Sequence, residues 1–119
     1  MASVQLPKKA MRLRIYLGEA DRHGREPLYE AIVKRARAQH LAGATVLRGP
    51  MGYGQSSRLH TAKILRLSSD LPIVIEIIDT AEKINAFLVK LDQMHITGLI
   101  TLDPVTVLRY GRAQVEAEE

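Results

Sequence analysis

Hydrophobic and polar residues alternate strictly near the start of the chain. Every second position from 11 to 17 is apolar, and the positions between them hold Arg12, Arg14 and Tyr16. A period of two places successive side chains on opposite faces of a strand, so this pattern predicts a strand that is covered on one side. Residues 71–79 give the clearest strand of all, because β-branched residues occupy both faces and only Glu76 interrupts them.

Two stretches repeat their apolar residues at helical spacing. The first begins at Pro27, which suits the first turn of a helix, and is expected to run to about Leu41 and to be ended by Gly43. Its inward residues are predicted to be Leu28, Ala31, Ile32 and Ala36. The second follows Asp79, interpreted as the cap of a capping box with Glu82. Its inward residues are predicted to be Ile84, Phe87, Leu88 and Leu91.

Two further strands complete the pattern. Residues 44–48 are expected to form one, and residues 99–108 a last one that is bulged or lies at an edge, because Pro104 cannot donate to a ladder. Periodicity leaves residues 61–67 open between a strand and a short helical turn. The resulting order, βαββαβ, predicts an α+β, ferredoxin-like fold in which an antiparallel sheet carries both helices on one face.

The face of this sheet that lies away from the helices is also apolar. Val74 and Ile78 point to the side opposite Ile73, Ile75 and Ile77. Leaving such side chains in water forgoes roughly 1.5–3 kcal/mol each. The sequence therefore predicts an oligomer in which the open face is covered.

Length and charge set the broad class. The 119 residues are enough for one domain with a real core; we expect a flexible segment at 1–10, the domain at 11–110 and an acidic tail at 111–119. The net charge of +4 favours anionic partners. Nucleic acid is not expected, because the chain has no Trp, one Phe and no aromatic-rich strand for stacking bases. With no cysteine and no signal sequence, the protein is expected to be soluble and cytoplasmic.

A glycine-rich loop lies inside a long window without acids. Residues 31–69 contain no Asp or Glu, and the loop runs through this window from Arg48 to His60. Its glycines let the backbone turn and approach a partner closely, while its arginines, hydroxyls and amides donate hydrogen bonds. The pattern favours an anion site, although a tightly turning surface loop with solvated Arg58 and His60 explains it as well.

Catalytic and metal sites find little support. The spacing of Gly49, Gly54 and Ser56 resembles a phosphate-binding P-loop, but Gln55 stands where that motif needs lysine. The histidines are too scattered for a zinc motif, and no nucleophile lies beside an evident base. We expect no metal, no resident cofactor and no enzymatic activity.

Five segments together resemble the PII-like family catalogued as domain of unknown function 190. They are residues 13–19 (LRIYLGE), 27–33 (PLYEAIV), 43–49 (GATVLRG), 52–54 (GYG) and 71–76 (LPIVIE). The resemblance covers about Met11 to Tyr110. It implies a ferredoxin-like subunit that assembles as a trimer, similar to the PII nitrogen signalling proteins.

The resemblance also implies where ligands and partners bind. In PII proteins adenine nucleotides occupy clefts between subunits, and the long loop after the second strand contacts target proteins. Carried onto this chain, ligand binding falls to the loop and to the basic segment after the last strand: Arg48, Gly49, Gly52, Gly54, Ser56, Ser57, Arg58, His60, Arg109 and Arg112. Partner binding falls to the loop residues Met51, Tyr53 and Gln55. The PII phosphate-loop motif is absent, and Thr97-Gly98 is only a fragment of it.

These observations predict a homotrimer that senses a small anionic metabolite and regulates a transporter or an enzyme through its loop. The metabolite favoured by the resemblance is an adenine nucleotide acting as effector. Two other classes stay open. One is an enzyme acting on a phosphorylated small molecule at the same cleft. The other is a structural trimer that docks a membrane transporter without any ligand.

Overall fold

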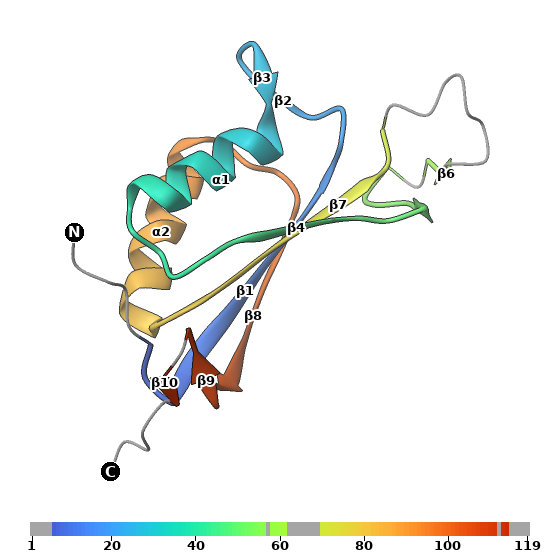
Figure 1. Cartoon of the computed structure of the whole chain (residues 1–119). Coiled ribbons are helices and arrows are strands. Elements are labelled where there is room, and N and C mark those ends of the chain that lie inside the picture. The colour runs from blue at the N-terminus through green and yellow to red at the C-terminus, as the bar shows by residue number, and fades with distance from the viewer. Residues whose placement is uncertain (1–5, 57, 62–69, 112, 115–119) are drawn as a thin grey trace.

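The computed structural model describes residues 6–56, 58–61, 70–111 and 113–114 of the chain. Its main sheet is antiparallel and has four strands, in the order β4 (Thr45–Arg48), β7 (Pro72–Asp79), β1 (Lys9–Gly18) and β8 (Leu99–Thr106). The helices α1 (Leu28–Ala38) and α2 (Ala81–Gln93) lie on the same side of this sheet (Figure 1). The predicted ferredoxin-like α+β fold is confirmed.

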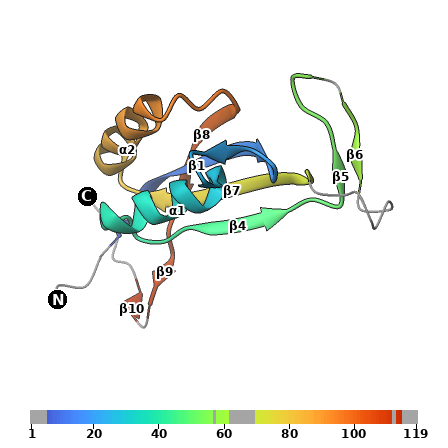
Figure 2. The ribbon, with the colours of Figure 1, turned by 90° about the horizontal axis from the view of Figure 1, so that it is seen from above.

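Three short pairs of strands extend this body. They are β2 (Arg22–His23) with β3 (Glu26–Pro27), β5 (Met51–Gly52) with β6 (His60–Thr61), and β9 (Arg109–Tyr110) with β10 (Ala113–Gln114). The β5–β6 hairpin, formed by the glycine-rich loop, stands away from one end of the sheet (Figure 2). In both views β9 and β10 lie at the opposite end. Residues 62–67, left open between strand and helix, lie outside the described residues.

The core follows the alternation of the strands. Leu13, Ile15, Ile73, Ile75 and Ile77 are almost fully buried beneath the helices. The inward residues predicted for α1 are all buried, and so are Ile84, Phe87 and Leu91 of α2, with Leu88 partly buried. Strand β8 is an edge of the sheet, as Pro104 indicated.

The ends of both helices differ from the expectation. Helix α1 ends at Ala38, not near Leu41, and the left-handed residue that ends it is His40, with φ of 60°, not Gly43. The amide of His40 donates to the carbonyl of Arg37, and that of Leu41 donates to the carbonyl of Ala36, which is the Schellman pattern. His95 has a φ of 56° just beyond α2. Two histidines therefore take the conformation usually left to glycine.

The cap of α2 is Thr80, not Asp79. The hydroxyl of Thr80 accepts from the amide of Lys83 at 3.2 Å. Asp79 is instead fully buried, and its carboxylate accepts from the amides of Thr80 at 2.7 Å and Ala42 at 2.8 Å. Asp79 thereby ties the chain after α1 to the start of α2.

The open face of the sheet carries two ion pairs across neighbouring strands. Arg12 lies opposite Asp103 and Arg14 opposite Glu76 in the strand register, with N–O distances of 2.5 and 3.0 Å. Apolar side chains surround them: Val74 and Ile78 are partly exposed, and 52% of Leu47 and 61% of Leu99 are exposed.

Across the described residues, no helix is long and apolar enough to cross a membrane.

A close backbone approach fixes the chain where β8 begins. A Cβ placed on Gly98 would lie 2.1 Å from the carbonyl oxygen of Tyr16, which no real contact allows. We predict that Gly98→Ala lowers the free energy of unfolding by about 1–3 kcal/mol, because β8 must move away from β1. Urea unfolding measures this change. Gly43→Ala is the matched control, since nothing lies within 4 Å of its added Cβ, and an equal loss in both variants would contradict the prediction.

The Arg12–Asp103 pair gives stability a defined pH dependence. The hydrogen bond from Arg12 lowers the pKa of the Asp103 carboxyl, and partial desolvation opposes it. A carboxyl whose pKa is lower in the folded state stabilises the fold above its unfolded pKa of about 3.9, and this contribution disappears as pH falls through the folded value. We therefore expect Asp103→Asn to be less stable than the parent at pH 7, with the gap closing below about pH 4. A gap in urea unfolding that stays constant with pH would contradict this.

Candidate ligand-binding site

A groove of about 660 Å³ lies between the β5–β6 hairpin and the end of the main sheet. Four segments line it: the end of β1 and the turn after it, the hairpin, the start of β7, and the connection from α2 to β8. Their residues are 16–18, 21, 52–56, 60, 70, 72, 73 and 97–99. The groove is therefore built by parts of the chain that are far apart in sequence.

The groove collects some of the residues predicted to bind a ligand. Gly52, Gly54, Ser56 and His60 line it, together with Tyr53 and Gln55 of the predicted partner-binding set. Arg48, Gly49, Met51 and Arg58 belong to the same loop but do not line the groove. Arg109 lies in β9, at the opposite end of the sheet (Figure 1). Ser57 and Arg112 lie outside the described residues.

The basic side chains of the loop meet acids from other elements. Arg48 pairs with Glu19 at 2.6 Å, and the imidazole Nε2 of His60 lies 3.5 Å from Asp70. Glu19 follows β1 and Asp70 precedes β7. Residues 31–69 contain no acid, but acids from other elements lie beside them in the fold. The expectation that the donors of this loop have no carboxylates nearby is therefore wrong for Arg48 and His60.

Two carboxylates, those of Asp21 and Asp70, line the groove beside Gly18. Asp70 accepts from the amide of Ala20 at 2.9 Å, and Asp21 accepts from the amide of Gly18 at 3.0 Å. One oxygen of each lies within 3.5 Å of the position that a Cβ on Gly18 would take. Backbone hydrogen bonds therefore hold both acids close together at one wall.

The hairpin rests on the proline that begins β7. The amide of Gly49 donates to the carbonyl of Pro72 at 2.8 Å. A Cβ on either Gly49 or Gly52 would lie 3.0 Å from Cγ of the Pro72 ring. Both glycines thus let the hairpin backbone approach this ring, and Pro72 also lines the groove. Any movement of the hairpin relative to Pro72 changes the shape of the groove.

Sequence reasoning missed the walls of the groove that lie outside the loop. Tyr16, Asp21, Asp70 and the 97–99 segment were not assigned to the site, although all line it. The available signal was the Thr97-Gly98 pair, which was noted only as a fragment of a phosphate loop. The two acids gave no local signal, because only the pairing of β1 with β7 brings them together.

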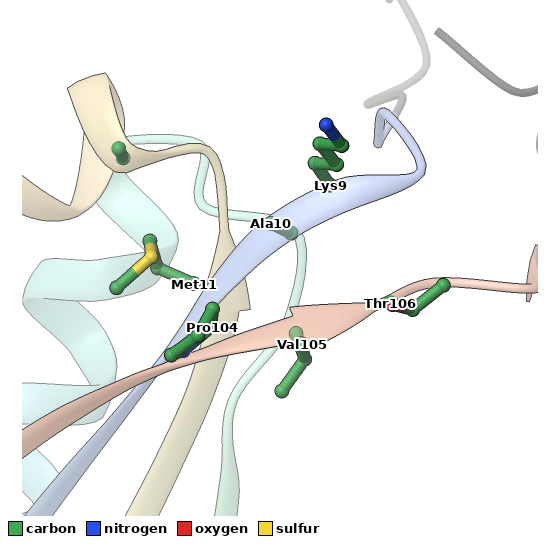
Figure 3. A pocket seen from close by; sticks show the side chains of 7 residues that line it. Lys9, Ala10, Met11, Pro104, Val105 and Thr106 are labelled. Atoms are coloured by element: carbon green, nitrogen blue, oxygen red, sulfur yellow. The ribbon is translucent and has the colours of Figure 1, made fainter.

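A second, smaller pocket of about 470 Å³ lies near the other end of β1 (Figure 3). It is lined by Lys9, Ala10, Met11, Ala81, Pro104, Val105 and Thr106. Lys9 is its one charged lining residue, and none of the predicted site residues is among them. In the described part of the chain, no group of three or more His, Cys, Asp or Glu residues is placed to hold a metal ion.

The fold is the one that the five sequence segments imply. The chain belongs to the family called domain of unknown function 190, described as "Uncharacterized ACR, COG1993", whose model matches residues 10–107. The resemblance found in the five sequence segments is therefore confirmed.

Relatives from two organisms support the assignment. A UPF0166 protein of Aquifex aeolicus (strain VF5) is 41% identical over 100 residues, covering 84% of this chain and 94% of its own. A UPF0166 protein of Methanocaldococcus jannaschii is 42% identical over 95 residues, covering 79% and 87%.

A solved structure shares the fold. It is described as CPII, a nitrogen regulatory PII-like protein from Thiomonas intermedia K12, bound to ADP, AMP and bicarbonate. The TM-score is 0.62 at 17% identity, and the match covers 85% of this chain and 90% of that one. This likeness shows that the chain has the PII-like fold.

The contact with Pro72 is testable by amide hydrogen exchange. We predict that Pro72→Ala speeds the exchange of the β5 and β6 amides about fivefold, because losing the ring contact costs the hairpin on the order of 1 kcal/mol. Pro104→Ala is the control: it also replaces a strand proline, and so has a similar effect on the unfolded chain, but it lies outside the groove. Equal exchange in both variants would contradict the prediction.

Proposed function

We propose that this protein is a PII-like regulatory protein, and not an enzyme, that binds a small anionic ligand in a cleft between subunits of a trimer. The ligand is an adenine nucleotide. Binding orders or moves the β5–β6 hairpin, which then binds or releases a target such as a transporter or an enzyme. The nucleotides bound by the PII-like structure of the same fold support this choice of ligand.

The proposal rests mainly on one observation: the β5–β6 hairpin forms part of the wall of the groove. Gly52, Gly54 and His60 belong to the hairpin and line the groove at the same time. A ligand in the groove therefore contacts the hairpin, which stands away from the sheet (Figure 2). Tyr53, 71% exposed, is available there to a partner.

The open face and the position of Arg109 support the proposed assembly. The face away from the helices exposes Leu47 and Leu99 beside two ion pairs, and covering it recovers hydrophobic free energy. Strand β9, which holds Arg109, lies at the end of the sheet opposite the β5–β6 hairpin (Figure 1). Only the Arg109 of a neighbouring copy is therefore suited to reach a ligand in this groove, which the trimer would allow.

Calorimetric titration with ATP, ADP, AMP and cyclic AMP tests the ligand, and sedimentation equilibrium tests the assembly. We expect at least one of these nucleotides to bind, and a mass three times that of the chain. A monomer that binds none of them would overturn the proposal. A target that is captured equally well with and without nucleotide would favour a ligand-free docking role instead.

Two arginines separate the sensing role from a purely structural one. Neither Arg58 nor Arg109 lines the groove of its own subunit, so each would reach the nucleotide only after the hairpin moves or from a neighbouring copy. On that proposal we predict that Arg58→Ala and Arg109→Ala each weaken nucleotide binding by about 1.5–3 kcal/mol, the contribution of a charged hydrogen bond. Arg37→Ala is the control, since this residue is exposed on α1 and belongs neither to the glycine-rich loop nor to the segment after β8. Unchanged affinity in both arginine variants would remove these residues from the site.

A further inference from the structure

The groove is acidic in this subunit. Asp21 and Asp70 line it, and among the described lining residues the one group that can carry positive charge is His60. No Lys or Arg from the described ranges takes part in the lining. A loop that is basic in sequence therefore encloses a space that the rest of the fold makes negative.

Backbone hydrogen bonds fix the two carboxylates in positions where they can accept further hydrogen bonds. Asp70 is fixed by the amide of Ala20 and lies beside His60, while Asp21 is fixed by the amide of Gly18. The side chain of Asp70 keeps 32% of its surface exposed. An ionised carboxylate accepts hydrogen bonds and donates none. This wall suits hydroxyl and amino groups, such as those of a nucleoside, and disfavours phosphate.

We infer that Asp21 and Asp70 make the groove select ligands of low negative charge, so that a nucleoside monophosphate binds more tightly than a triphosphate. This inference rests on the proposed function, because it concerns the same groove. Each added phosphate brings negative charge close to two negative charges that backbone hydrogen bonds hold in place, and charges of the same sign repel one another at such short range. A divalent cation bound to the triphosphate cancels part of that charge and reduces the penalty.

Calorimetry with AMP and ATP tests the selection. In EDTA we expect the parent protein to bind AMP at least tenfold more tightly than ATP, and Mg²⁺ to narrow this gap. Raising the salt concentration is expected to narrow it too, because screening weakens the repulsion. These measurements need no variant, so they hold even if a substitution disturbs folding.

Two substitutions assign the effect to the carboxylates. Asp21→Asn and Asp70→Asn keep an oxygen that accepts from the backbone but remove the charge, and each is expected to reduce the preference for AMP over ATP by about tenfold. Asp92→Asn is the matched control, because Asp92 is exposed on α2 and outside the groove. It is expected to leave the preference unchanged.

The outcomes separate this inference from the proposed function. If no nucleotide binds, both are overturned. If nucleotides bind but ATP in EDTA binds as tightly as AMP, the selection by charge is wrong while the nucleotide site stands. Selection by charge is also wrong if both Asp variants keep the full preference for AMP, or if Asp92→Asn loses as much of this preference as they do.

Discussion

The structure depends on the double pairing of β1. This strand lies between β7 and β8, and its residues 11–16 are opposite a residue of each neighbour. Its alternation sends Leu13 and Ile15 under the helices and Arg12 and Arg14 to the open face. The same pairing brings the turn after β1 beside the start of β7, where Asp21 and Asp70 meet. Core, open face and groove thus follow from one strand in one register, because a slip by one residue would exchange its faces.

Patterns that repeat along the chain could be predicted from the sequence. The alternation at 71–79 identified Ile73, Ile75 and Ile77 as core, because a strand that packs against helices must bury one face. The helical spacing found the buried side of α1 for the same reason. Such predictions need only the period of the strand or helix and the fact that one of its faces is buried.

The pattern of apolar residues could not predict features for which two neighbouring residues are equally suitable. Asp79 and Thr80 are both good caps, and the choice fell to Thr80 because Asp79 is drawn into the core by the amide of Ala42. His40 takes the left-handed position because the chain must turn where Leu41 can be buried, three residues before Gly43. The acids of the groove were missed because long-range pairing, not sequence spacing, places them there. Charge counted along a chain is a poor guide to charge in a cleft.

The proline at the start of β7 has a consequence for how this fold varies. Pro72 lacks an amide hydrogen, and its ring supports the base of the hairpin at Gly49 and Gly52. Beyond this point, within the described chain, β5 and β6 form a two-stranded sheet separate from the main sheet. Doubling the length of such a loop costs only about 0.6 kcal/mol in closure entropy. Insertions and deletions can therefore accumulate in the hairpin while the sheet keeps its register, so related chains can differ in reach without differing in fold.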